Sequence, residues 1–464
     1  MRALRPVLLF ATLLGGCAVG PDFVAPPTSV APQYAASVDA GYGSDAPLLQ
    51  FWQRFDDPTL AALIEQALAA NHDLRIALAN LNEARALLRE SRLELAPSVA
   101  AQAGYAETLT SADAAPGDRD ARSGALYNGS FAAIWELDLF GRLRRNLEAG
   151  HATEEARRAD LHDVQISVVA EVARNYFELC GGQLELAVAQ RNAGNQRQTL
   201  GLAQARLDAG SGTDFDLARA QAQLRSTLAT LPAIETRIAA ARNRLAVLTG
   251  RAPETADVIA VAQELAPLPR LVQVGQPEVL LRRRADIRAA EARLAAATAR
   301  IGVATADLFP RVQLVGEIGF SVADLDAAGH SRGETYAFGP AISWAAFDLG
   351  RVQARIRQTE AQADGALAAY ERTVLRALEE TENTLTAYAN ARRELDHLAA
   401  GVEAGARAVA LAHVRFDNGA TDFLDVLDAE RTQLESEARL ARARTAAAAS
   451  LVALYKSLGG DWSV

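Results

Sequence analysis

The sequence has few cysteine, methionine and histidine residues. Among 464 residues there are 2 cysteines, 1 methionine and 6 histidines. Cys17 and Cys180 cannot build a disulfide framework, and Cys180 is expected to be a lone, packed thiol. The histidines form no HExxH motif, no metal-binding spacing with cysteine and no recognisable catalytic triad. We therefore expect no enzymatic activity, no metal and no bound cofactor.

The sequence also lacks net positive charge and long apolar runs. The formal net charge is −10 at pH 7, which excludes a basic surface for nucleic acid. Beyond residue 16 there is no continuous apolar stretch of roughly 20 residues, the length that a membrane-spanning helix needs. Any part of the mature chain that crosses a membrane is therefore expected to do so as strands.

The first 17 residues, MRALRPVLLFATLLGGC, are typical of a secretory signal. Two arginines precede an apolar run and small residues that end at Cys17. Residues 14–17, LGGC, are similar to the lipobox of bacterial lipoproteins, so cleavage after residue 16 would leave Cys17 as a lipidated N-terminus. An ordinary cleaved signal with a chance cysteine is the alternative. Ala18 follows rather than aspartate, which by resemblance to bacterial lipoproteins favours the outer membrane.

The rest of the chain contains an internal sequence repeat. Residues 72–99 match residues 285–312 at a spacing of 213, and WELDLFGR at 135–142 matches WAAFDLGR at 344–351 at a spacing of 209. Such self-similarity indicates repeated structural units. The expected divisions are a signal peptide (1–16), a lipidated extended segment (17–57), repeat 1 (58–250), a linker (251–275) and repeat 2 (276–464).

Each repeat is expected to contain three helices. A helix of medium length ends at a proline, a very long helix follows two short strands, and a return helix comes after a glycine turn. The expected helices are 72–95, 142–208 and 214–249 in repeat 1, and 285–308, 351–417 and 422–458 in repeat 2. At 1.5 Å per residue a helix of about 67 residues is on the order of 100 Å long, so we expect a rod-like body.

The long helices carry the 3.5-residue period of a coiled coil. The predicted seam of the first one is Val168, Val172, Asn175, Leu179, Gly182, Leu186, Ala189, Ala193, Gln196, Leu200, Ala203 and Leu207; that of the second includes Val374, Leu378, Thr381, Leu385 and Tyr388. Gly181 and Gly182 predict a local bend in the first long helix, because mid-helix glycine costs about 1 kcal/mol relative to alanine.

Four alternating segments, 98–107, 124–137, 311–322 and 334–347, predict strands with one apolar face. A half-buried sheet of a soluble domain is the alternative. Their length of about ten residues suits membrane strands, which number at least about eight in a closed barrel. An open sheet edge in a bilayer leaves unpaired backbone groups that cost several kcal/mol each. Several copies of the chain are therefore expected to share one barrel.

Four motifs resemble the outer membrane factor family of bacterial tripartite efflux pumps (TolC-like), in its lipoprotein branch (OprM/NodT type). They are CAVGPDF at 17–23, WELDLFGR at 135–142, RFDNGATDFLDVLDAE at 415–430 and LYKSLGGDW at 454–462. The resemblance implies an α+β fold: a homotrimer with four strands per protomer in a 12-stranded outer-membrane β-barrel, continuous with a long periplasmic α-helical coiled-coil barrel. The linker 251–275 then falls in the equatorial region.

The implied function is that of a passive exit duct in the outer membrane. It would conduct small molecules exported by an inner-membrane transporter of the resistance-nodulation-division (RND) type through a periplasmic adaptor protein. A duct for protein secretion and a lipid-anchored coiled-coil scaffold of the envelope are the alternatives. The scaffold has no use for four amphipathic strands at matching places in both repeats.

The resemblance also implies where the duct closes. Gly210 and Gly419, which are 209 residues apart, mark two helical turns. Just beyond the second turn Leu424 would form an apolar ring, and Asp425 and Asp428 would form acidic rings; the spacing of three and four residues independently places them on one helix face. Six carboxylates in three chains should favour cations or take up protons. A solvated first helical turn capped by Asp422 is the alternative.

The turns themselves would contact the adaptor through Gly210, Ser211, Gly212, Gly419 and Ala420. Some relatives hold the entrance shut through a tyrosine and an arginine at positions matching Phe416 and Thr421. Neither residue here can form those polar links, so Phe416, Thr421 and Asp422 are treated as candidate latch or tip residues of a different kind. Ser211 and Gly212 stand where relatives often carry an apolar residue.

Overall fold

The computed structural model describes residues 18–27, 30–36, 42–43, 45, 55–111, 113–114, 123–258, 268–269 and 272–459. The predicted signal peptide and Cys17 lie outside these residues, as does much of the predicted linker. The chain divides into two compact units. The sheet unit contains Met1–Pro27, Asn80–Arg158 and Ala289–Glu371, and the helical unit contains Thr28–Ala79, Ala159–Arg288 and Arg372–Val464.

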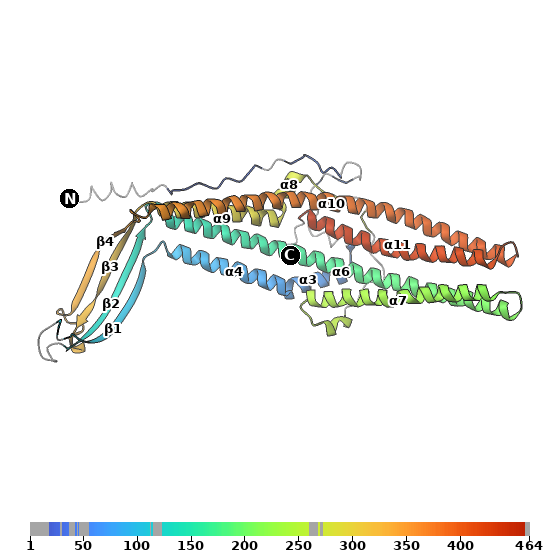
Figure 1. Cartoon of the computed structure of the whole chain (residues 1–464), viewed down its shortest axis with the longest axis horizontal. Helices are drawn as coiled ribbons and strands as arrows, with labels where there is room; N and C mark the ends of the chain where they lie inside the picture. Colours follow the sequence, from blue (N-terminus) through green and yellow to red (C-terminus); the bar gives the residue numbers. More distant parts are fainter. Residues whose placement is uncertain are drawn as a thin grey trace. The chain divides into compact units, whose positions relative to one another are not determined.

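The elements follow each other in nearly the predicted order (Figure 1). They are α3 (Pro58–Ala70), α4 (His72–Leu93), β1 (Ser98–Leu109), β2 (Ser123–Leu137), α6 (Arg142–Asp208), α7 (Asp214–Leu248), η3 (Pro253–Val258), α8 (Pro277–Arg283), α9 (Ala285–Ala306), β3 (Arg311–Val322), η4 (Leu325–Ala327), β4 (Glu334–Ser343), α10 (Leu349–Asp417) and α11 (Phe423–Ser457). The last strand is shorter than predicted, because residues 346–347 form a turn in which Asp348 donates to the carbonyl of Ala345.

The sheet unit holds one antiparallel sheet in the order β1-β2-β3-β4 (Figure 1). Phe131 stands opposite Ile318, which stands opposite Tyr336 on the next strand, so these side chains share a face. That face is exposed within the described chain: the exposed fraction is 87% for Tyr336 and 81% for Phe338. A half-buried sheet would cover these rings, so the exposure argues against a soluble sheet domain. The described helices include none with the length and apolar character that crossing a membrane requires.

The WELDLFGR motif and its repeat join strands to helices. The indole of Trp135 donates to the carbonyl of Leu95 at 2.9 Å, and Trp344 donates to Leu308 at 3.0 Å. These two pairs occupy matching positions in the repeats. Asp138 accepts hydrogen bonds from the backbone N–H groups of residues 143 and 144 and thereby satisfies donors of the first turn of α6. The motif therefore fixes how the chain leaves β2 and enters the long helix.

The predicted seams pack in the helical unit. Every predicted seam position of α6 is buried or half-buried, as are the five predicted on α10. α6 continues through Gly181 and Gly182 without interruption, and the bend predicted there stays a prediction. A Cβ atom at Gly181 would lie 1.8 Å from Oγ1 of Thr445, and one at Gly182 would lie 2.8 Å from Cγ1 of Ile238. The glycines are thus required for close approach of α11 and α7.

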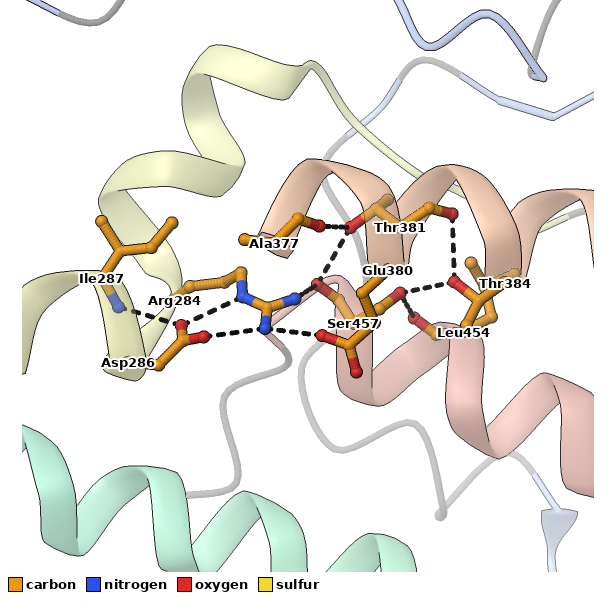
Figure 2. A network of polar contacts seen from close by, with 9 residues as sticks. All are labelled: Arg284, Asp286, Ile287, Ala377, Glu380, Thr381, Thr384, Leu454 and Ser457. Atoms are coloured by element: carbon orange, nitrogen blue, oxygen red, sulfur yellow. Dashed lines mark hydrogen bonds and ion pairs between the residues drawn. The ribbon is translucent and has the colours of Figure 1, made fainter. Parts of the chain in front are cut away.

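A polar network joins three helical segments of this unit (Figure 2). Arg284 forms two hydrogen bonds to Asp286, of 3.0 and 2.9 Å, one of 2.7 Å to Glu380 on α10, and one of 2.8 Å to the carbonyl of Ser457. Its side chain is only 11% exposed. Burial alone would lower the pKa of Arg284, but the hydrogen bonds and charges of Asp286 and Glu380 outweigh it and raise the pKa, so the residue stays charged.

In the first repeat an uncharged residue, Asn71, takes the position of Arg284 and also donates a hydrogen bond to the end of the return helix. Asn71 stands 213 residues before Arg284 and donates to the carbonyl of Leu248 at 3.0 Å. Leu248 and Ser457 are the last residues of the two return helices, α7 and α11. Helix ends leave carbonyl groups without intrahelical partners. Both repeats therefore satisfy one such carbonyl from the residue just before α4 or α9.

We expect the Arg284→Met variant to melt at a lower temperature than the wild type. The change leaves Asp286 and Glu380 without their cation, which costs about 1–3 kcal/mol at these partly exposed carboxylates. Circular dichroism of the detergent-solubilised protein during heating measures the loss. Arg282→Met is the matched control, because the pair of Arg282 with Glu278 is exposed. Equal melting temperatures for the two variants would contradict the assignment of the network as a structural tie.

Candidate functional site

The two glycine turns of the helical unit have the same backbone geometry. Gly210 and Gly419 have positive φ angles of +72° and +69°, a conformation that glycine adopts without steric cost. Each turn shows the paired hydrogen bonds of a Schellman motif, which satisfy carbonyls at the helix end. The bonds are Gly210 N to Leu207 O, Ser211 N to Arg206 O, Gly419 N to Phe416 O and Ala420 N to Arg415 O. Glycine at these positions is therefore explained by turn geometry.

The helices that leave the two turns are capped differently. Thr213 accepts a hydrogen bond from the backbone N–H of Asp216 at 3.1 Å and donates to its carboxylate at 2.7 Å. Asp422, at the matching position, is the N-cap of α11 but makes no side-chain cap hydrogen bond. The alternative in which Asp422 caps the helix through its carboxylate is therefore wrong for this conformation.

Phe416 packs into a small apolar cluster at the second turn. The buried members are Ala203, Ala220, Phe423 and Val426. The rings of Phe416 and Phe423 have centroids 5.4 Å apart, and the guanidinium of Arg206 lies 4.6 Å from the centroid of Phe416. Arg206 also donates to the carbonyl of Ser211 in the first turn at 3.2 Å. One arginine therefore connects the first turn to the last helical turn of α10 through a hydrogen bond and a cation–π contact.

The predicted acidic residues are exposed and hydrogen-bonded. Asp425 accepts a hydrogen bond from the hydroxyl of Thr421. Asp428 pairs with Arg431 at 2.8 Å, and Arg431 also reaches Glu435 at 3.1 Å. Leu424, which directly precedes Asp425 in the sequence, is half-buried. The described turn thus brings Thr421 and Asp425 together, whereas Asp428 is held by an arginine that the sequence-based prediction did not include.

The signals for the missed residues differ in kind. Arg431 lies three residues after Asp428, a spacing at which opposite charges meet on a helix, so the sequence contained that pair. Arg206 and Phe416 are 210 residues apart, and no local pattern predicts their contact. Thr199, His413 and Glu430, which come together near the same turns, were also missed for this reason.

The first described residues of the chain are held in the sheet unit by Arg145. Its guanidinium donates to the carbonyls of Val19 and Gly20 at 3.1 and 3.2 Å and pairs with Asp22 at 2.7 Å and Glu148 at 2.8 Å. The Arg145 side chain is only 5% exposed. The backbone N–H of Val19 also donates to the carbonyl of residue 140, just before α6 begins. Residues 19–22 are thus fastened beside the junction of β2 and α6.

Cys180 is a packed thiol, as predicted. It is buried in the core of the helical unit. Burial raises the pKa of the Cys180 thiol to about 12, although a hydrogen bond with Tyr176 acts in the opposite direction. The thiol is therefore neutral and inert at physiological pH. Among the described residues no group of three or more histidine, cysteine, aspartate or glutamate side chains is arranged to hold a metal ion.

An uncovered aromatic sheet face, together with helices of 67 and 69 residues at matching repeat positions, is the architecture of an outer-membrane channel protein. The model of the outer membrane efflux protein family matches residues 63–251 and 277–460. The chain belongs to this family of efflux channels, which are not enzymes, and its place is the outer membrane.

Relatives match over almost their whole length. The solvent efflux pump outer membrane protein SrpC of Pseudomonas putida is 33% identical over 466 residues, covering 98% of each chain. The outer membrane protein OprJ of Pseudomonas aeruginosa is 31% identical, covering 98% of this chain and 95% of its own. The solved outer-membrane channel OprN has a TM-score of 0.90 and 42% identity, covering 96% of this chain and 100% of its own.

We expect Arg206 and Phe416 to be energetically coupled. Arg206→Met and Phe416→Leu should each speed amide hydrogen exchange at residues 411–418. In the double variant the loss of opening free energy should be smaller than the sum of the losses in the two single variants. A coupling of about 0.5–1 kcal/mol is expected for a cation–π contact at this exposure. Arg219→Met is the matched control, because Arg219 lies over the exposed ring of Phe215 at the other turn. Additive effects would exclude a direct interaction.

We expect Arg145→Met to release residues 19–22. The variant loses four hydrogen bonds that hold residues 19–22 and the adjacent Glu148, so protease cleavage within residues 18–27 should become several times faster. Mass spectrometry of timed digests measures the rate. Arg351→Met removes only an exposed pair with Asp348 and should cleave like the wild type. Unchanged cleavage in Arg145→Met would contradict the proposed clamp.

Proposed function

We propose that this protein is the exit duct of a tripartite efflux system and conducts small molecules passively through the outer membrane. The observation that carries the proposal is the uncovered apolar face of the four-stranded sheet. Aromatic and aliphatic side chains on that face gain free energy when lipid replaces water, at about 25 cal/mol per Å² of apolar surface removed from water. No such gain is available to a soluble scaffold, which leaves the envelope scaffold without support.

A homotrimer accounts for the two free sheet edges. Within the described chain β1 and β4 each pair with one neighbour only. Their outer backbone groups need partners in a bilayer, because water is absent there. Pairing β4 of one copy with β1 of the next satisfies both edges. Three copies supply 12 strands, which is enough to close a barrel, whereas four strands are too few.

Lipid on Cys17 would add a second membrane contact. Cys17 lies outside the described residues, but the next described segment is fastened by Arg145 beside the start of α6. A lipidated cysteine one residue before Ala18 would therefore be held near the end of the membrane strand β2. Two attachments to one membrane are stronger than a single acyl chain, which alone gives marginal binding.

The entrance of the duct is proposed at the start of α11. In three copies Leu424 would form an apolar ring, and Asp425 and Asp428 would form acidic rings. Arg431 neutralises part of the charge of Asp428, so Asp425 contributes more of the net negative field. The contact of Arg206 with Phe416 takes the place of the polar latch that some relatives have, since neither Phe416 nor Thr421 carries the required groups.

The two glycine turns are proposed to contact a periplasmic adaptor, which connects the duct to an inner-membrane transporter of the resistance-nodulation-division type. Gly210, Ser211, Gly212, Gly419 and Ala420 form the turns. Near them Leu202 and Leu411, at matching repeat positions, and Phe215 are exposed apolar side chains. Exposed apolar side chains of this size favour a protein partner. Relatives named for solvent and antibiotic efflux support small-molecule cargo over secreted proteins.

The test is conductance of the purified full-length protein in planar lipid bilayers. The wild type should form cation-preferring channels, and the Asp425→Asn/Asp428→Asn double variant should lower the cation-to-anion permeability ratio by about two- to fivefold, because each carboxylate contributes up to about 1 kcal/mol at 4 Å in water. Reversal potentials in a salt gradient give the ratio.

Asp214→Asn is the matched control for the charge change, because Asp214 opens the helix after the first turn. It should leave the permeability ratio unchanged. A wild-type protein that forms no channels would contradict the duct. Channels whose permeability ratio is the same in the double variant would contradict only the entrance assignment.

A further inference from the structure

A polar cavity of about 330 Å³ lies in the helical unit near the second turn. It is lined by residues of α6, α10 and α11, and the following side chains matter here: Gln196, Thr199, His413, Glu430, Gln433 and Glu437. Gln196 occupies a seam position of α6, where coiled coils normally place apolar residues. Both polar atoms of its buried amide lack a protein partner, as does Oε1 of the buried Gln433.

Glu430 connects the three helices at the edge of this cavity. Its carboxylate accepts a hydrogen bond from the hydroxyl of Thr199 on α6, at 3.1 and 3.2 Å to the two oxygens, and lies 3.0 Å from Nε2 of His413 on α10. The Glu430 side chain is 15% exposed and the His413 side chain is 43% exposed. The carboxylate is therefore mostly shielded, whereas the imidazole reaches solvent and can exchange protons.

The position of Glu430 ties it to the entrance. It lies on the same helix as Leu424, Asp425 and Asp428, two residues beyond the last of them. The hydroxyl of Thr199 belongs to α6, a helix of the first repeat, whereas His413 and Glu430 belong to the hairpin of α10 and α11. The bond to Thr199 is thus a polar contact between the two repeats, next to the apolar contact made by the Phe416 cluster.

Other charged groups around the cavity leave Glu430 as the main partner of His413. From α11 the charged lining residues are Glu430 and Glu437, and from α6 there is Arg191. Glu437 accepts a hydrogen bond from Gln433 at 2.8 Å and lies 3.6 Å from Arg191, so its charge is already engaged. Arg191 is directed to that same carboxylate. Glu430 is the carboxylate for which the structure gives a direct contact with the imidazole.

We propose that Glu430 is a positioning residue for the entrance, and that protonation of His413 strengthens its hold. This rests on the proposed function of Leu424, Asp425 and Asp428. Histidine side chains change charge between about pH 5 and 8. When His413 is protonated, its hydrogen bond to Glu430 becomes a charged pair, which fixes the carboxylate for Thr199 and keeps the start of α11 against α6. When His413 is neutral, the hold is weaker and the entrance is more often open.

The test compares channel conductance in planar bilayers at pH 5.5 and pH 8.0 for the full-length protein. In the wild type the open fraction should be about two- to fivefold lower at pH 5.5, the size expected for a partly exposed charged pair. Glu430→Gln keeps the shape and hydrogen-bonding groups but removes the charge, so its open fraction should be high at both pH values. His413→Asn should likewise lose the pH dependence that His413 supplies.

Two further variants separate this hold from other effects. Thr199→Val should raise the open fraction at both pH values but keep the pH dependence, because the pair of His413 with Glu430 remains. Glu403→Gln is the control, because Glu403 forms only an exposed pair with Arg407 on α10, and it should behave like the wild type. Any pH dependence of the open fraction that comes from Asp425 and Asp428 would remain in His413→Asn. The pH dependence that this variant loses is therefore the part that His413 supplies.

The outcomes are decisive in both directions. A wild-type channel whose open fraction and pH dependence are the same in Glu430→Gln and His413→Asn would overturn the inference and leave the duct intact. A wild-type protein without channel activity would overturn the proposed function itself. If Glu430→Gln does not assemble, His413→Asn alone decides, because the exposed imidazole is not required for packing.

Discussion

The free edges and the uncovered apolar face of the sheet are the constraint on which the rest of this structure depends. A four-stranded sheet has two edges whose backbone groups need partners, and its aromatic face needs an apolar surrounding. Within the described residues the single chain meets neither need, and the trimer proposed above would meet both together in a membrane. The Trp135 and Trp344 indoles fasten this sheet by donating to the carbonyls of Leu95 and Leu308, shortly before Pro97 and Pro310, where the helices have ended. Strand and helix are thus fixed to one another at matching places in both repeats.

Matching positions of the two repeats often have the same structural role but different side chains. Asn71 and Arg284 both satisfy the last carbonyl of a return helix, but only Arg284 adds two carboxylates, Asp286 and Glu380. The two glycine turns have the same hydrogen bonds, yet one is followed by a threonine cap and the other by an aspartate that makes no cap bond. The two repeats therefore share the backbone hydrogen bonds of the turn but differ in the side chains around it. That difference is where the candidate entrance lies.

The features that the sequence predicted well have a regular period along the chain, and the contacts that it missed join residues far apart in the sequence. Alternation located the strands and a 3.5-residue period located the buried seam of α6, because both patterns follow directly from backbone geometry. The bend expected at Gly181 and Gly182 stays a prediction, whereas the need for glycine there follows from a long-range contact, the space that Thr445 and Ile238 occupy. The contact of Arg206 with Phe416 joins residues 210 positions apart and has no local signature. The Asp428–Arg431 pair did have a local signature, the three-residue spacing at which opposite charges meet on a helix. Acidic residues on a helix should therefore be considered together with the cations on the same face.

The composition of the second turn is consistent with the entrance proposed there, which would have to be stable when closed and still able to open. The described contacts between the repeats near this turn include a small apolar cluster, a cation–π contact and a carboxylate bridge, all of modest strength. Each contributes on the order of 1 kcal/mol, so together they can favour one conformation without making the other inaccessible. The buried but unpartnered amide of Gln196 points the same way, because a seam position that gains little from packing weakens the coiled coil next to the turn. A partner that binds the exposed side chains of Phe215 or Leu411 would then need to supply only a few kcal/mol to shift the balance.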